Sequence, residues 1–313
     1  MKEKQAKKSR AWALCAIFLV IVFTALSWSL AKGTGRYSWD SVYAAFGLRA
    51  SSQAAQMPLS VHFLDVGQGD CIIVKCGDEV MLIDSGKQGN EQKIIRYMRN
   101  LNIKNIQYAV ATHPDSDHIG SMEEIIETFD TDCFMMPDIS GAQYAPTDLF
   151  ISLLESVEQS EIKSVAAESG KSYMLGDAVF TFIAPIKQYD DVNNMSAVIK
   201  LTYGERTFLF MGDAEFEEES DIVQSVASLH CDVLKAGHHG SNSSSSEAFI
   251  LAARPRYALI SVGTPNDYGH PNKNVIKRFE SEDCEVLRTD YCGTLVMGSD
   301  GENLLVDTEK SAR

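Results

Sequence analysis

The sequence predicts an α/β fold, in which buried strands alternate with the helices that cover them. Short apolar runs such as 59–66 and 80–84 are typical of strands, whereas apolar residues recur on one side of 91–101, as in an amphipathic helix. A loop rich in His and Asp follows the predicted strand 108–112, where α/β proteins usually carry functional groups. With 45% hydrophobic residues, the chain can form a sizeable core.

The predicted elements follow one another from residue 59 onward. In the first half we expect strands at 59–66, 70–76, 80–84, 108–112 and 132–136, and helices at 91–101, 120–129 and 148–160. In the second half we expect a helix at 215–229 and strands at 173–175, 179–184, 196–203, 207–211 and 231–236. Further helices and short strands close the chain.

The first 50 residues differ from the rest in charge and hydropathy. They hold eight basic and two acidic residues, and residues 11–31 contain no charge. A helix of 21 residues, at about 1.5 Å per residue, spans a bilayer, and the preceding positive charge places its start in the cytoplasm. We therefore expect a single-pass membrane anchor at 1–31, a linker at 32–57 and a domain at 58–313 outside the cytoplasm. The alternative is a cleaved signal peptide, which would give a secreted protein.

The net charge of the chain bears on whether it can bind nucleic acid. The whole chain carries a formal net charge of −15 and residues 1–50 sum to +6, so residues 51–313 sum to −21. Such a domain repels nucleic acid on average, unless a local basic patch overrides the mean.

The cysteines form no Cys-x-x-Cys pair, which argues against a zinc knuckle and favours buried free thiols. A disulfide between Cys284 and Cys292 is the alternative if the domain lies outside the cell.

The segment Thr112-His113-Pro114-Asp115-Ser116-Asp117-His118-Ile119-Gly120 has the composition of half a metal site. It contains two histidines and two carboxylates within six residues, and both side-chain types bind divalent metals. Three more clusters lie at predicted strand ends, namely Asp84-Ser85-Gly86, Gly212-Asp213-Ala214 and His238-His239-Gly240. We expect all four to converge at one edge of the sheets.

In motif order the chain resembles the metallo-β-lactamase superfamily, and more closely the hydrolase domain of ComEC-type competence proteins. The resemblance covers about residues 59–298 and is carried by Leu64-Asp65-Val66-Gly67-Gln68-Gly69-Asp70, the His/Asp loop, Asn193-Asn194-x-Ser196, His238-His239-Gly240-Ser241 and Gly269-His270-Pro271. It implies a four-layer αββα sandwich and two divalent metal ions, Zn or Mn, that hold a hydroxide between them.

The resemblance also implies roles for individual residues. His113 and Asp115 would bind one metal, Asp117 and His118 the second, and Asp213 both. His238, in preference to His239, would complete the set. Asp117 could also orient the attacking water, and His270 could donate a proton to the leaving group or bind the oxyanion. The surrounding shell or the substrate site would contain Asp84, Asn194, Ser196, His239 and Ser241.

Two departures from the superfamily pattern concern the metal. Asp115 stands where the superfamily usually has histidine, which makes the site richer in oxygen and makes Mn²⁺ or Mg²⁺ plausible beside Zn²⁺. No histidine occurs between His118 and Asp213, so that Asn193, Asn194 or Asp191 would have to substitute.

Several singled-out residues also have structural interpretations. His62 lies in an apolar strand and is interpreted as a core residue. Asp70 flanks a glycine-rich turn and could act only in shaping it. Ser246 is the expected N-cap of the next helix, although serines there could also contact a phosphate. The acidic run 215–219 is expected to be a solvated helix N-terminus.

Together these features predict an exported, membrane-anchored, metal-dependent hydrolase of phosphodiesters, with DNA as a possible substrate. One alternative is a hydrolase of small envelope phosphoesters, carboxylic esters or lactones on the same fold. The other is a non-catalytic, metal-stabilised binding module of an envelope or DNA-uptake complex.

Overall fold

The computed structural model describes residues 52–310, which form two β-sheets. The first sheet has the strand order β17 (Leu304–Thr308), β16 (Leu295–Ser299), β1 (Leu59–Phe63), β2 (Ile72–Cys76), β3 (Glu79–Ile83), β5 (Tyr108–Val110), β7 (Cys133–Met136) and β8 (Lys163–Ala166). The second has the order β15 (Glu285–Arg288), β14 (Tyr257–Ile260), β13 (Val233–Lys235), β12 (Arg206–Phe210), β11 (Val198–Tyr203), β10 (Ala178–Ala184) and β9 (Ser172–Leu175). A short pair joins β4 (Asn105–Ile106) to β6 (Asp130–Thr131).

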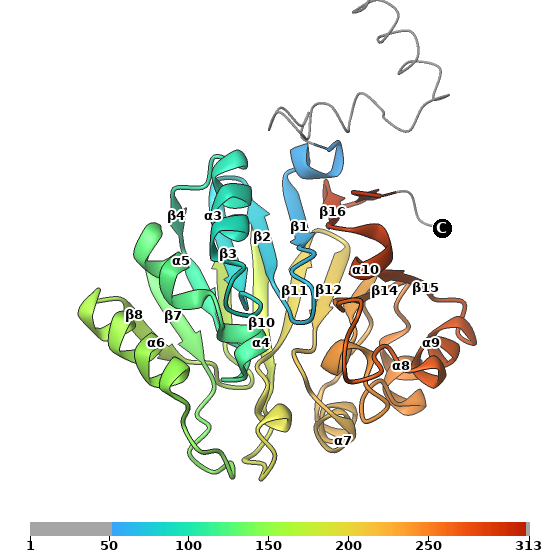
Figure 1. Ribbon diagram of the computed structural model, residues 1–313. Coiled ribbons are helices and arrows are strands. Elements are labelled where there is room, and N and C mark those ends of the chain that lie inside the picture. The colour runs from blue at the N-terminus through green and yellow to red at the C-terminus, as the bar shows by residue number, and fades with distance from the viewer. Residues whose placement is uncertain (1–51, 311–313) are drawn as a thin grey trace, which may run out of the picture. The chain divides into compact units, whose positions relative to one another are not determined.

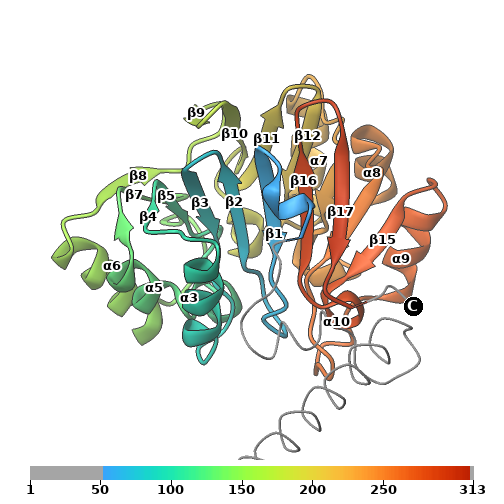
Figure 2. The same cartoon turned by 90° about the horizontal axis from the view of Figure 1, so that it is seen from above.

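The sheets pack face to face and helices cover their outer faces (Figures 1 and 2). The inner core contains aromatic side chains from both sheets, among them Phe63, Phe180 and Phe210. On the first sheet lie α3 (Glu91–Asn100), α5 (Met122–Thr128) and α6 (Asp148–Gln159), and on the second lie α7 (Phe216–Ser225), α8 (Glu247–Ala253) and α9 (Lys273–Glu280). The predicted αββα sandwich is confirmed, since each sheet buries apolar residues on both faces.

The parallel parts of the sheets position the functional loops. Strands β3, β5 and β7 are parallel in the first sheet, and β12, β13 and β14 are parallel in the second. Residues that follow their carboxyl ends therefore meet at one edge, where ligands bind in α/β folds. The short helix α4 (Ser116–Ile119), which follows β5, and α7, which follows β12, lie at the same lower end of the sheets in Figure 1.

Most predicted elements lie within a few residues of the observed ones, and the differences have local causes. The helix predicted at 120–129 corresponds to α5, whereas the short helix α4 before it was not predicted. Gly120 lies between them against backbone, where a Cβ would be 2.4 Å from the Gln88 amide nitrogen. The edge strand β8 was not predicted. The expectation of a solvated acidic run is wrong for Glu218 and Glu219, which are buried. Ser246 is confirmed as an N-cap, because its hydroxyl accepts from Phe249 N.

The predicted segment 1–31 and nearly all of the predicted linker lie outside the described residues. At the end of that linker, the short helix η1 (Ala54–Gln56) contacts the domain, where Ala54 N donates to Asp307 Oδ2 at 2.8 Å. Within 52–310, every helix is too short or too polar to cross a bilayer.

The six cysteines of residues 52–310 are buried free thiols, as predicted, and Cys284 and Cys292 form no disulfide.

Candidate metal centre

Asp84 anchors the His/Asp loop to the end of β3. Its buried carboxylate accepts from Thr112 N at 2.8 Å and from Thr112 Oγ1 at 2.7 Å, and lies 2.7 Å from His118 Nδ1. Because the carboxylate accepts the Nδ1 proton, it leaves the lone pair of His118 on Nε2. The structure thus places Asp84 behind the candidate ligand His118 and fixes the direction of its ring.

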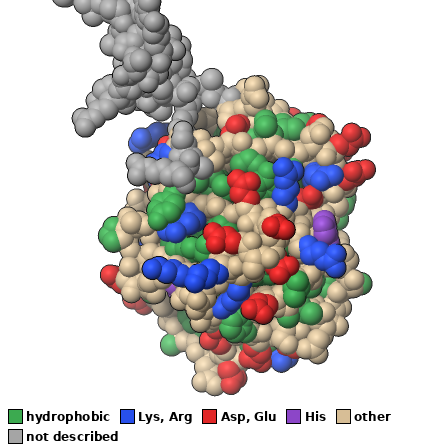
Figure 3. Space-filling view, turned by 90° about the vertical axis from the view of Figure 1, so that its right-hand side faces the viewer, with side chains coloured by type: hydrophobic (Ala, Val, Ile, Leu, Met, Phe, Trp, Pro, Cys, Tyr) green, Lys and Arg blue, Asp and Glu red, His purple; other side chains and the backbone are tan. Residues whose placement is uncertain are grey.

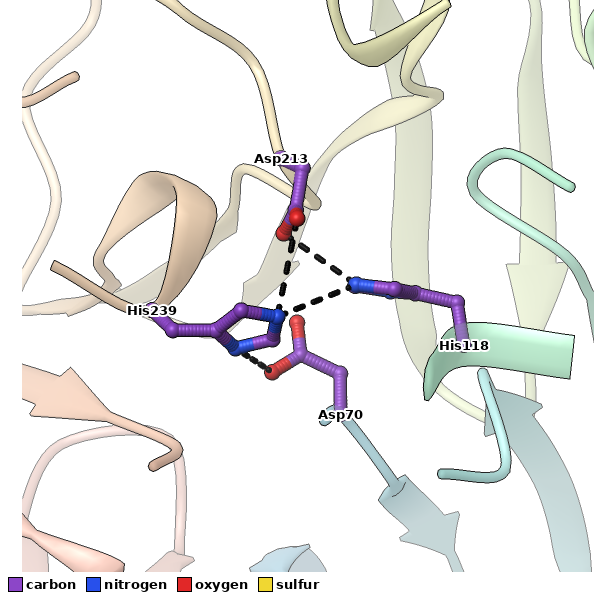
Figure 4. A group of neighbouring side chains, drawn as sticks. All are labelled: Asp70, His118, Asp213 and His239. Carbon is purple, nitrogen blue, oxygen red and sulfur yellow. Dashed lines mark hydrogen bonds and ion pairs between the residues drawn. The ribbon is translucent and has the colours of Figure 1, made fainter. Parts of the chain in front are cut away.

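Four buried side chains from four different segments converge in front of Asp84 (Figure 4). They are Asp70, His118, Asp213 and His239, and their candidate ligand atoms all lie within 4.8 Å of one another. His118 Nε2 lies 3.2 Å from Asp213 Oδ1 and 3.3 Å from His239 Nε2, and His239 Nε2 lies 3.5 Å from Asp213 Oδ2. Two imidazole nitrogens that face each other beside a carboxylate are the arrangement expected around a shared cation.

The electrostatics of this group favour bound positive charge. Burial lowers the pKa of His118 and of His239, but the nearby carboxylates outweigh burial: Asp213 and Asp84 raise the His118 pKa well above its usual value, and Asp213 and Asp70 raise the His239 pKa to about 9. Conversely, burial raises the pKa of Asp213, but the neighbouring histidines outweigh it and lower that pKa well below its usual value. Without metal, protons supply the positive charge that these carboxylates attract.

His113 and Asp115 form the other half of the group. His113 is fully buried, its ring lies 4.1 Å from that of His118, and burial lowers its pKa to about 3. Its Nε2 lies 3.8 Å from Asp115 Oδ2 and 4.0 Å from Asp213 Oδ2, and within the described chain it has no hydrogen-bond partner. The Asp115 side chain is 41% exposed. A buried imidazole nitrogen without a partner, aimed at two carboxylates, fits a divalent ion.

Ser196 occupies the position between the first loop and Asp213. Its hydroxyl accepts from Asp213 N at 3.0 Å and lies 3.5 Å from His113 Nδ1. A Cβ on Gly212 would lie 2.9 Å from the Ser196 Oγ, so that this close approach requires glycine. Asn194 lies farther back, where its Oδ1 accepts from Glu215 N at 3.0 Å at the start of α7. The structure therefore places both side chains as supports for neighbouring backbone.

His238 and His239 point in different directions because both have left-handed backbone, with φ of 45° and 51°. His239 is buried, and its Nε2 faces Asp117 Oδ2 at 3.5 Å as well as Asp213. His238 is 24% exposed; its Nδ1 lies 2.9 Å from Glu215 Oε1, and its Nε2 lies 3.7 Å from Asp213 Oδ2. Sequence analysis preferred His238 as the ligand, whereas the structure brings His239 into the central group and His238 to its rim.

Two residues lie behind His239, of which sequence analysis named Asp70 only as a possible turn residue and did not single out Lys235. The Asp70 carboxylate lies 3.4 Å from His239 Nδ1 and contacts the ammonium group of Lys235. Burial raises the pKa of Asp70, but Lys235 and His239 outweigh it and lower that pKa to about 2. The sequence contained one signal: Lys235 is a charged residue within the apolar run of a central parallel strand, where a charge needs a partner.

His270 and Ser241 lie at the outer side of the group. The His270 ring packs edge-on against His238, with centroids 5.4 Å apart, and its Nδ1 is buried with no hydrogen-bond partner among residues 52–310. The Ser241 hydroxyl pairs with that of Ser243 at 2.8 Å, and Ser243 Oγ donates to Glu215 Oε1 at 2.6 Å. Ser241 thus belongs to the network that holds Glu215 and His238.

The sequence matches the Metallo-beta-lactamase superfamily over residues 64–264. It is 29% identical over 254 residues to ComE operon protein 3 of Bacillus subtilis, which covers 75% of this chain and 32% of that protein. It is 28% identical over 291 residues to competence protein ComA of Neisseria gonorrhoeae, which covers 91% of this chain and 38% of that protein. The chain thus spans about a third of the length of these relatives.

A solved structure with a similar fold is CmlA, a diiron β-hydroxylase from Streptomyces venezuelae. Its TM-score is 0.52 at 12% identity, and the match covers 85% of this chain and 59% of that one. At this identity the similarity concerns the fold alone.

Proposed function

Because the chain belongs to the metallo-beta-lactamase superfamily, we propose that it is a metal-dependent hydrolase of phosphodiesters. The relationship to ComEC-type competence proteins, predicted from the sequence motifs, is confirmed. The observation that carries the proposal is the pair of His118 and His239, whose Nε2 atoms face each other at 3.3 Å beside Asp213. This arrangement has the donors of a metal site.

Six side chains would hold two divalent ions, namely His113, Asp115, Asp117, His118, Asp213 and His239. The set contains three carboxylates, one of them Asp115 at a position where the superfamily usually has histidine. Such an oxygen-rich set suits Mn²⁺ as well as Zn²⁺. When bound, the ions would lower the pKa of a water molecule and neutralise charge on phosphoryl oxygens.

The protein's own side chains would prepare the reaction around these ions. Asp84 and the Ser261 carbonyl accept the Nδ1 protons of His118 and His239, which leaves both Nε2 lone pairs for metal. Burial, together with His238, lowers the pKa of His270. Two roles were expected for His270, proton donation to the leaving group and binding of the oxyanion. A neutral His270 at the rim favours the second role, in which its N–H donates a hydrogen bond to an anionic substrate oxygen.

DNA is the substrate class that we propose first, since two relatives are named a competence protein and a recombination protein. The acidic net charge of residues 51–313 limits the binding mode. Figure 3 shows one face of the molecule, on which Lys and Arg lie interspersed with Asp and Glu and form no continuous basic stripe. Because of the acidic net charge, a short single-stranded segment at the site is favoured over a long duplex held in a groove.

We further propose that residues 11–31 anchor the enzyme in the cell membrane and that the domain acts outside the cytoplasm. The uncharged run and the positive charge before it support this topology. Protease added to intact cells should degrade the domain, and degradation only after lysis would contradict the proposed topology.

The test of activity uses the full chain, stripped of metal and reloaded with Zn²⁺ or Mn²⁺. Substrates are bis-p-nitrophenyl phosphate, single- and double-stranded DNA, and p-nitrophenyl butyrate as a carboxylic ester. Metal-dependent cleavage of the phosphodiesters should be lost in Asp117→Asn and retained in Asp177→Asn, an exposed aspartate on the β9–β10 turn. Cleavage of the carboxylic ester alone would contradict the proposed phosphodiester hydrolysis. Binding of two metal ions without turnover of any substrate would favour the non-catalytic binding module.

A further inference from the structure

An exposed aromatic ring lies on the loop that follows β14, beside the candidate metal centre. Tyr268 is 60% exposed, whereas tyrosine side chains in folded proteins are on average of intermediate burial. Its ring stacks on His270, with centroids 5.7 Å apart and an angle of 25° between the planes. The ammonium group of Lys87 lies 5.6 Å from the Tyr268 centroid. Within residues 52–310, Lys87 Nζ forms no ion pair.

The loop that carries Tyr268 is held by its own side chains. Asn266 Nδ2 donates to Gly263 O at 2.8 Å and to His270 O at 2.7 Å. The Oδ1 of the same residue accepts from Tyr268 N at 3.2 Å and from His270 N at 3.1 Å. One asparagine thus closes the loop with four hydrogen bonds, so that the exposed ring sits on preorganised backbone.

Both ends of this loop are packed tightly on the loops of the metal centre. A Cβ on Gly263 would lie 2.5 Å from Gln68 N, and one on Gly240 would lie 2.7 Å from the Pro271 Cβ. In addition, Asn272 N donates to Gly240 O at 2.8 Å. Because the loop is fixed at both ends, Tyr268 keeps its position relative to the candidate ligands without any substrate.

Two ring contacts connect Tyr268 to the centre. Tyr268 stacks on His270, His270 packs edge-on against His238 at 5.4 Å, and His238 Nε2 lies 3.7 Å from Asp213 Oδ2. A phosphodiester held by the metal ions that Asp213 would bind would therefore place an attached nucleoside near the exposed ring of Tyr268.

We propose that Tyr268, backed by His270 and flanked by Lys87, is a stacking platform for a base of a single-stranded nucleic acid. The proposal rests on the proposed function and names its substrate class. An aromatic ring offers a π-face to any base without sequence preference, and an adjacent unpaired ammonium group suits the neighbouring phosphate. In an acidic domain, stacking provides affinity that does not depend on many phosphate contacts.

The test separates binding from cleavage. A fluorescent thymidine pentanucleotide and the same oligomer with abasic residues are offered to the metal-free full chain, and binding is followed by anisotropy. The metal-loaded enzyme is then assayed on the same pair. Variants are Tyr268→Ala, Tyr268→Phe as the conservative replacement, and Tyr291→Ala as the control, since Tyr291 is 55% exposed but stacks on Arg288.

We expect the wild type to prefer the base-bearing oligomer in binding and in KM. Tyr268→Ala should weaken binding of that oligomer roughly 5- to 100-fold, with little effect on the abasic one, and Tyr268→Phe should retain the preference. Equal binding of both oligomers by the wild type, or unchanged binding by Tyr268→Ala, would overturn the platform even if cleavage is observed. Normal stacking-dependent binding without cleavage would instead count against the proposed hydrolysis.

Discussion

Lys235, in the centre of β13, is fully buried and its ammonium group contacts the carboxylate of Asp70, which precedes β2 in the other sheet. The ammonium group also donates to Gly212 O at 3.1 Å, just before Asp213. One cation thus links the Asp70 side chain behind His239 to the backbone that carries Asp213. The pair therefore connects both sheets beneath the candidate metal centre.

We predict that Lys235→Met destabilises the domain by about 3–5 kcal/mol, because it leaves the Asp70 carboxylate buried without its partner. Lys163→Met, on the exposed edge strand β8, should change the free energy of unfolding by less than about 0.5 kcal/mol. Urea unfolding of both variants measures the difference. Adding Asp70→Leu to Lys235→Met should restore much of the loss, and a double variant that is no more stable than the single one would contradict the role of the pair.

We predict that Asp84→Asn lowers zinc affinity about 10- to 100-fold without abolishing folding. The amide can still accept from Thr112 N, but an Nδ2 donor facing His118 Nδ1 shifts the histidine proton to Nε2, the atom that faces Asp213 and His239. Competition with a chromophoric chelator measures the affinity. The exposed Asp78→Asn serves as the control, and equal affinities for the two variants would show that Asp84 does not set the tautomer.

The fold and the general place of the site could be predicted from local patterns. Apolar runs and amphipathic periodicity are encoded within a few residues, and ligand-type residues at the ends of strands imply convergence at one sheet edge. The Asp70–Lys235 pair could not be predicted in this way, because it depends on how closely two sheets approach. Likewise, the sequence His238-His239 does not reveal the two successive left-handed residues that aim the rings apart.

The different directions of these rings lead to distinct expectations for metal content. His239→Ala removes a nitrogen from the central group, so that we expect the loss of about one metal ion per chain. His238→Ala removes a ring that Glu215 holds at the rim, so that metal content should stay near the wild-type value while activity falls. Elemental analysis after dialysis measures both. Loss of metal in His238→Ala alone would restore the assignment favoured by the sequence.

His62, in the middle of β1, makes stability depend on pH in a predictable direction. Its ring is buried, with Nδ1 2.9 Å from Tyr97 Oη and Nε2 3.0 Å from Ser60 Oγ. Burial, with a smaller effect of Lys75, lowers the pKa of His62 from 6.5 to about 4. Between these values the unfolded chain takes up a proton that the folded chain does not, so that the His62 contribution is complete above pH 6.5 and is lost as the pH falls toward 4.

Replacing His62 by Gln should therefore flatten the acid side of the stability curve. We expect the difference in unfolding free energy between wild type and His62→Gln to change by up to about 3 kcal/mol between pH 6.5 and 4, at roughly 1.4 kcal/mol per pKa unit. Chemical denaturation at several pH values measures it. Parallel curves for the wild type and His62→Gln would show that folding does not lower the His62 pKa.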